Sequence, residues 1–246
     1  MAGHSAYANI KHRKAAQDKR RSKLFTKVVK EIYVAVKEGG PDPNGNPRLS
    51  MALRNARKVS VPRENIEKAI KKGSGSEAET YEEFTLEGYG PQGVAIIVEC
   101  MTENPNRTIA HVRSWFSKYD GALGKNGSVS YLFSRKGVFV FPAQGLDEES
   151  LMLELIDHGL EDLERSEDQF VATCRFENFG ALNARLEALS LDAETSLEQI
   201  PATYVSPDPA LLTPLFKLFE LLEEDDDIQN FYHNLEVTPD IAALMP

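Results

Sequence analysis

The chain changes both its residue pattern and its charge near residue 76, and this change constrains the fold more than any other feature. Residues 1–76 hold 18 Lys or Arg and 6 Asp or Glu, whereas residues 77–246 hold 10 and 32. The two parts therefore carry net charges of +12 and −22 within a chain total of −10. Apolar residues recur at helical spacing before the change, and strand-like runs alternate with helical runs after it. This predicts a basic helical domain followed by an acidic body of helices and strands.

Residues 17–38 predict an amphipathic helix within the basic part. Its apolar stripe repeats every four residues at Leu24, Val28, Ile32 and Val36. The opposite face gathers cations, which we expect the helix to present as an open row: Lys19, Arg20, Lys23, Lys27 and Lys30.

Two shorter helices are expected to complete this domain, after a break rich in Gly, Pro and Asn at residues 38–47. Asn46 is suited to cap the first of them, with Pro47 in its first turn. The second opens at Pro62 and closes at Gly73. The sequence "GSGSEAE" then reads as a hinge-like linker.

The acidic body alternates strands with helices, which predicts two small domains that each pair a sheet with helices. The expected strands are residues 82–90, 93–101, 127–133, 137–143, 169–176, 198–206 and 228–237, with "SRKG" (134–137) as a tight turn. The expected helices are residues 107–119, 147–159, 178–189 and 209–227.

Motifs that would indicate an enzyme or a metal site are weak. No HExxH pattern is present, and no His lies beside a nucleophile motif. The acids "EEDDD" at 223–227 point in different directions, so they predict a solvated turn, and at a helix C-terminus they oppose the helix dipole and favour fraying. We therefore expect no catalytic residue, no metal ligand and no cofactor.

Two further loops are rich in glycine or asparagine, and neither predicts a known functional motif. In "GALGKNGSVSYLF" Lys125 precedes Asn126 and a strand follows, whereas a phosphate loop needs GK[ST] leading into a helix. The loop "TENPNRT" is explained by turn and cap chemistry. Arg107 is the one polar residue in that loop that we would test for function.

The compartment is expected to be the cytoplasm. No apolar run approaches the length of a membrane span, and the N-terminus lacks the apolar segment of a secretory signal. A mitochondrial transit peptide is also rich in Arg and Lys, but here the basic region runs directly into a helical pattern. Cys100 and Cys174 each lie in an apolar run, so buried reduced thiols are expected.

The basic N-terminal region predicts a polyanionic partner, namely nucleic acid, since Lys and Arg neutralise phosphates and displace counterions. Tyr7 would either stack on an unpaired base or pack on its own domain, and Asn9, Arg13 and Gln17 are candidates for reading bases. The candidates for phosphate contact are Lys11, Arg13, Lys14, Lys19, Arg20, Arg21, Lys23 and Lys27.

These residues also carry a family resemblance. The first 32 residues, "MAGHSAYANIKHRKAAQDKRRSKLFTKVVKEI", closely resemble the start of the YebC-type family of transcriptional regulators. That family includes the mitochondrial translational activator of cytochrome c oxidase subunit I. The likeness continues through "EGGPDPNGNPRL", "VPRENIEKAIKKG", "EGYGPQGVAIIVEC", "TENPNRT", "GSVSYLF" and "IQNFYHNLEV". One departure is Ala6 and Tyr7, where the family usually has Lys followed by Trp.

The resemblance implies an α+β multidomain fold: an N-terminal helical bundle, then two ferredoxin-like α/β domains, the third inserted in the second. The corresponding ranges are residues 1–78, then 79–134 with 208–240, and residues 135–207 as the insertion. It implies DNA binding in transcriptional regulation, or alternatively ribosome association that eases stalled translation, such as at consecutive prolines. It implies no catalytic residues.

Two other classes of function stay open on the sequence. A cleft between the two α/β domains would suit an enzyme, and the acidic body would suit a scaffold that binds other proteins. Neither has a motif of its own here, so a non-enzymatic nucleic-acid-binding protein is the leading hypothesis.

Overall fold

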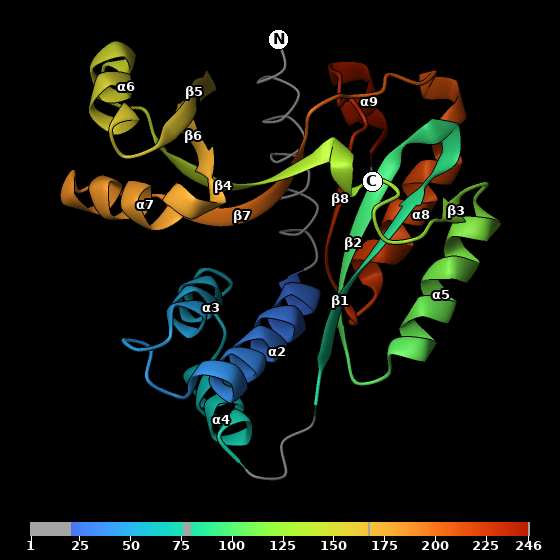
Figure 1. Ribbon diagram of the computed structural model, residues 1–246, viewed down its shortest axis with the longest axis horizontal. Helices are drawn as coiled ribbons and strands as arrows, with labels where there is room; N and C mark the ends of the chain where they lie inside the picture. Colours follow the sequence, from blue (N-terminus) through green and yellow to red (C-terminus); the bar gives the residue numbers. More distant parts are fainter. Residues whose placement is uncertain (1–20, 76–79, 167, 246) are drawn as a thin grey trace.

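The computed structural model describes residues 21–75, 80–166 and 168–245, and the described part of the basic domain forms three helices (Figure 1). The helices are α2 (Arg21–Gly39), α3 (Pro47–Lys58) and α4 (Arg63–Gly73). Asn46 caps α3 as predicted, since its side chain accepts a hydrogen bond from the backbone N–H of Leu49. The apolar stripe of α2 is also confirmed, because Ile32 and Val36 are buried against α3 and α4.

The first sheet is antiparallel, with the strand order β3-β1-β2-β8. Its strands are β1 (Glu82–Tyr89), β2 (Ala95–Thr102), β3 (Ala122–Leu123) and β8 (Ile228–His233). The helices α5 (Pro105–Lys118) and α8 (Thr213–Glu224) pack against one face, where Ile96 and Val98 meet Phe116 and Leu215 in one core. The chain thus returns after more than a hundred residues to add β8 beside β2.

The second sheet is also antiparallel, with the order β5-β6-β4-β7. Its strands are β4 (Phe133–Pro142), β5 (Leu160–Ser166), β6 (Gln169–Arg175) and β7 (Glu194–Pro201). The helices α6 (Glu148–Ile156) and α7 (Phe179–Ala188) supply Leu155 and Leu182 to its core. Helices followed by two four-stranded antiparallel sheets make an α+β multidomain fold, as predicted.

The expected turn "SRKG" is wrong, because residues 134–137 lie inside β4, which pairs with β7 along this whole stretch. Gly137 is needed there for space: a Cβ would lie 2.6 Å from the ring of Phe179 and 2.9 Å from Cys174 Sγ. The predicted strand at 127–133 is a loop and a 3₁₀ turn (Ser130–Leu132) instead. The expected boundary between residues 134 and 135 therefore falls within a strand.

Other elements differ in their ends or were not predicted. The strand β5 and the short helix α9 (Pro239–Leu244) were not expected, and β7 begins four residues before its expected start. A 3₁₀ turn (Pro209–Leu211) precedes α8, where one long helix was expected. The remaining 3₁₀ turns are Pro91–Gly93 and Phe176–Asn178. Both cysteines are free and buried, as predicted. Among the described residues, we find no helix with the length and apolarity that a bilayer requires.

Candidate nucleic-acid interface

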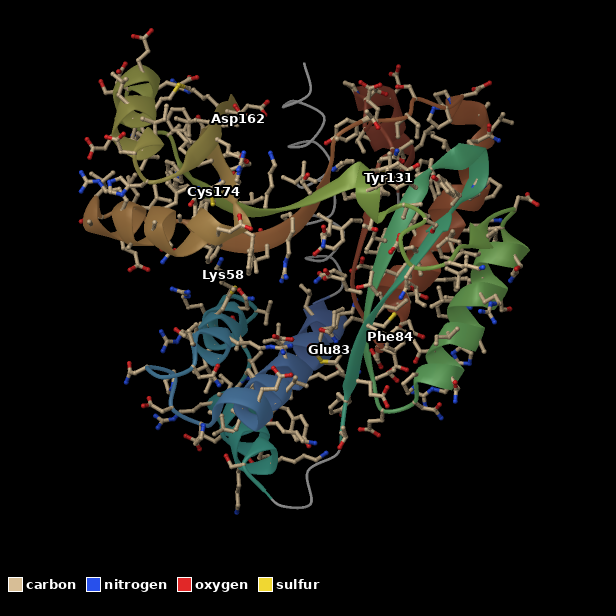
Figure 2. All side chains as sticks on the ribbon, in the orientation of Figure 1. Lys58, Glu83, Phe84, Tyr131, Asp162 and Cys174 are labelled. Carbon is tan, nitrogen blue, oxygen red and sulfur yellow. The ribbon has the colours of Figure 1, made fainter. Side chains whose placement is uncertain are left out.

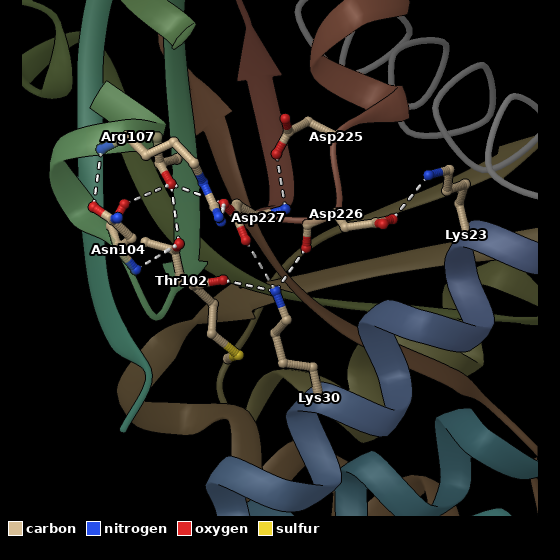
Figure 3. A network of polar contacts seen from close by, with 10 residues as sticks. Lys23, Lys30, Thr102, Asn104, Arg107, Asp225, Asp226 and Asp227 are labelled. Carbon is tan, nitrogen blue, oxygen red and sulfur yellow. Dashed lines mark hydrogen bonds and ion pairs between the residues drawn. The ribbon is translucent and has the colours of Figure 1, made fainter. Parts of the chain in front are cut away.

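The cationic face of α2 lies against the acidic loop between α8 and β8 (Figure 3). Lys23 Nζ lies 3.0 Å from Asp226 Oδ1. Lys30 Nζ donates to the carbonyl oxygens of Met101 (2.9 Å) and Asp226 (2.8 Å), and it lies 3.4 Å from Asp227 Oδ1. The open row of cations expected on this helix is therefore wrong for Lys30, whose side chain is 10% exposed. The side chain of Lys23 is 40% exposed, so its pair with Asp226 is a weak surface pair.

Lys27, between them, is buried, with 6% of its surface exposed. Its Nζ donates to the carbonyl oxygen of Glu223 (3.3 Å) in the last turn of α8. Burial lowers the pKa of Lys27, and the charges of Glu223, Asp226 and Asp225 oppose that shift only in part. A cation at this end of α8 offsets the repulsion between its acids and the helix dipole. Lys27 therefore has no open path to a phosphate in this arrangement.

Asp227 joins α2 to the start of α5. It accepts hydrogen bonds from Arg107 Nη2 (2.7 Å) and Thr108 Oγ1 (2.9 Å). Burial alone would raise the pKa of Asp227, but these hydrogen bonds and one from Thr102 outweigh it, so the pKa is lowered. Arg107, the residue singled out in "TENPNRT", thus pairs with the protein's own Asp227, although its side chain is 52% exposed (Figure 3).

The acidic loop was predicted correctly only in part. Residues 223–227 were expected to form a solvated turn on a frayed helix end. A turn is present, and Glu224 and Asp226 are exposed, but Glu223 is buried and the side chain of Asp227 is 15% exposed. The runs of Lys and of Asp were each visible in the sequence, but nothing local indicated that they meet across more than 190 residues.

Apolar contact surrounds these ionic contacts. Tyr33 and Val34 of α2 are buried together with Met101 of β2. The ring of Tyr81 meets that of Tyr33 edge-on, with 5.4 Å between centroids. These contacts cover the end of the first sheet, so α2 is held to the middle domain by buried surface as well as by charge.

Two further sets of ion pairs fix the basic domain. Arg48 on α3 pairs with Glu31 (2.8 Å) and Glu38 (2.6 Å) of its own domain and with Glu83 of β1. Burial alone would lower the pKa of Arg48, but its hydrogen bonds to Glu31 and Glu83 outweigh that effect and raise it. Lys58, at the side of α3 that faces the second sheet (Figure 2), lies 4.0 Å from Glu194.

The predicted phosphate contacts thus fall into two groups. Lys23 and Lys27 contact the acidic loop, and Arg21 begins α2, with its side chain outside the description. The other predicted residues lie outside the described part of the chain: Lys11, Arg13, Lys14, Lys19 and Arg20, together with Ala6, Tyr7, Asn9 and Gln17. Their roles stay predictions.

The open positive charge of the described domain lies on α3 and α4. Arg57 and Lys71 are exposed, and neither makes an ion pair with another described residue. The side chains of Arg63 and Lys68 are 91% and 70% exposed, and among the described residues they pair with Glu67 and Glu64, four positions away on α4. Such surface pairs are weak, so these cations remain available. The sequence interpretation left this group out, although "RNARK" and "EKAIKK" carried the signal.

Comparison with known proteins agrees with this division of the chain. A model of the TACO1/YebC N-terminal domain matches residues 5–76, and one of the TACO1/YebC second and third domains matches residues 81–235. The chain belongs to the TACO1/YebC family. The match to the second TACO1/YebC model covers more than half of the sequence and includes both sheets.

A solved structure of similar fold is that of a conserved hypothetical protein from Aquifex aeolicus. It is 40% identical to this chain, with a TM-score of 0.78, and the match covers 89% of this chain and 91% of that one. The three-part arrangement of this TACO1/YebC chain therefore has a counterpart in a solved structure.

Proposed function

We propose that this chain is a non-enzymatic regulatory protein that binds nucleic acid, with DNA as the first candidate, through its basic N-terminal domain. The observation that carries the proposal is the exposed cationic surface of α3 and α4, in a domain of net charge +12. Cations in contact with solvent can displace the counterions of a phosphate backbone. The family model for the second and third domains is named for transcriptional regulation, which supports the same class of function.

The two groups of cations have different roles in this proposal. Lys27 and Lys30 donate to carbonyl oxygens of the acidic body, so they lie in the contact between the two parts and not on an open surface. Phosphate contact is assigned to the α3–α4 surface and to the basic residues that precede α2. The body, with its net charge of −22, repels a polyanion, so the nucleic acid would approach the basic domain from its exposed side.

Ribosomal RNA is the second candidate target, and one observation favours it. Lys27 and Lys30 of α2 contact the acidic body, so these two cations are not open to the major groove of DNA. Exposed Arg and Lys that contact phosphates suit a folded RNA as well as a duplex, because phosphate contacts do not read sequence. In this alternative the protein would act on translation from the ribosome.

The test uses the full chain and labelled duplex DNA, with a ribosomal RNA fragment in a parallel series. Neutralising Arg57 and Lys71 together (Arg57→Gln, Lys71→Gln) is expected to reduce the slope of log affinity against log salt by about 1 to 2. Arg113 on α5 and Lys125 are exposed cations of the acidic body, so Arg113→Gln with Lys125→Gln is the matched control. A flat salt response of the unaltered chain, or equal loss in both double variants, would contradict the proposal.

The two targets are separated by cosedimentation. If the protein sediments with ribosomes and the Arg57→Gln, Lys71→Gln variant does not, while duplex DNA binds only weakly, the translational role is supported. Specific enrichment on promoter DNA supports the transcriptional role instead.

A further inference from the structure

Helix α6 of the second sheet domain exposes apolar side chains on its outer face. Leu151 and Leu155 face the core and are buried. Met152, Leu153 and Ile156 are 39%, 74% and 57% exposed. Single exposed apolar residues are common, but three of them within two turns of one helix form a continuous apolar face.

This face is remote from the contacts that hold the protein together. Figure 1 shows α6 at the outer end of its domain, on the far side of α7 and β7 from the basic helices. Its outward side chains are therefore not part of the junction around α2. No described segment covers Leu153, since three quarters of its surface is exposed.

Acidic side chains flank the apolar face at both ends. Glu148 and Glu149 lie one turn before Met152 and Leu153, and Asp157 lies one turn after Leu153, so they share that side of the helix. All three are exposed, and none makes an ion pair with the part of the chain that the structure describes.

The surrounding sequence reinforces this charge. Residues 137–164 contain eight Asp or Glu and no Lys or Arg. Within the described part of the chain, the cation that pairs with α6 is Arg185 of α7, through Glu154. An apolar face within such a field repels nucleic acids and anionic membranes, and it attracts a cationic ligand.

We propose that the outer face of α6 is a docking surface for a cationic amphipathic segment of another protein. The segment would place two or three apolar side chains on Met152, Leu153 and Ile156, and Lys or Arg at its ends beside Glu148, Glu149 and Asp157. This is the helix-on-apolar-face mode of peptide recognition, with charge fixing the direction of the segment.

This inference is independent of the proposed nucleic-acid function. The two surfaces lie on different domains and have opposite charge, so either can fail while the other holds. A protein that bound nucleic acid at one end and a basic protein segment at the other would link the two.

The test uses the full chain and a labelled Leu/Lys peptide of about five helical turns, titrated by fluorescence anisotropy. Leu153→Ser with Ile156→Ser is expected to weaken binding at least about tenfold, because two large apolar contacts are lost. The matched control is Leu211→Ser with Leu244→Ser, which alters two apolar residues of similar exposure (49% and 54%) elsewhere on the chain. It is expected to change binding less than about twofold. Circular dichroism verifies that both variants fold.

A second variant and a second peptide test how much charge contributes to peptide binding. Neutralising the flanking acids (Glu148→Gln, Glu149→Gln, Asp157→Asn) is expected to weaken binding and to reduce its salt dependence. A Leu/Glu peptide of the same pattern is expected not to bind.

Three results would overturn the proposal. One is equal peptide affinity of the unaltered chain and the Leu153→Ser, Ile156→Ser variant. Another is equal binding of the Leu/Glu peptide. The third comes from sedimentation: a chain that dimerises unless Leu153 and Ile156 are replaced would show that a second copy, not a basic segment, occupies the face.

Discussion

The cations of α2 and those of α3–α4 belong to one basic domain, yet the structure uses them in opposite ways. Lys27 and Lys30 of α2 are buried or nearly so and donate to carbonyl oxygens and carboxylates of the middle domain. Arg57 and Lys71 of α3 and α4 face solvent. A cation that already has partners must lose them before it binds a phosphate, whereas an exposed cation loses only water and counterions. The net charge of a domain thus does not measure its capacity to bind nucleic acid.

The two groups of cations also differ in what they contribute, because those of α2 lie in the contact between domains and those of α3 and α4 are available for binding. The contacts of α2 combine ion pairs with buried apolar surface at Tyr33 and Met101, so they orient one domain on another. The α4 pairs are exposed and contribute little to stability. Three predictions test this contrast through variants of the α2 junction.

The largest expected effect comes from Asp227→Ala, which removes the acceptor shared by Arg107, Thr108 and Lys30. The side chain of Asp227 is 15% exposed, so its partners would be left poorly solvated. We expect a loss of about 2–3 kcal/mol in the free energy of unfolding, measured with urea. Asp226→Ala is the control, because the Asp226 side chain is 52% exposed and should cost less than about 1 kcal/mol. Equal losses of unfolding free energy in the two variants would show that Asp227 does not stabilise the contact between α2 and the middle domain more than Asp226 does.

An intermediate effect is expected on the pH dependence of stability. The pKa of Asp227 is lowered in the folded protein, so its contribution to stability is fully present above the unfolded value of about 4. That contribution is lost as the pH falls through the folded pKa. Asp227→Asn should therefore flatten the acid side of the stability profile, measured as urea midpoints between neutral and acid pH. An unchanged profile would contradict the role given to this carboxylate.

The smallest effect is expected from Lys27→Met. Burial lowers the pKa of Lys27, so its charge is held at a cost, and Met keeps the length of the side chain. We expect unfolding free energy to change by less than about 1 kcal/mol and DNA affinity by less than about twofold. Lys27→Ala, which removes the buried stem, should cost more stability than Lys27→Met. A large loss of DNA affinity in a folded Lys27→Met protein would show that this lysine contacts phosphate after all.

Much of the fold could be predicted because its signals are local. The cap at Asn46, the apolar stripe of α2 and the strand patterns of β1 and β2 each depend on residues a few positions apart. The prediction of a turn at "SRKG" was wrong because the role of its glycine depends on residues that are distant in the sequence. Gly137 resembles a turn residue in sequence, but it is small because Phe179 and Cys174 approach it from elsewhere in the chain.

The candidate site shows the same contrast between local sequence signals and contacts that join distant residues. The sequence by itself determined that the first 76 residues are basic, that helices lie within residues 21–73, that the rest is acidic, and which face of α2 carries its cations. Only the tertiary structure decided that this face meets the acidic loop, leaving α3 and α4 to present the open charge. The physical reason is distance along the chain: periodicity and capping act over a few residues, whereas the contact of Lys30 with the Asp226 carbonyl joins residues 196 positions apart.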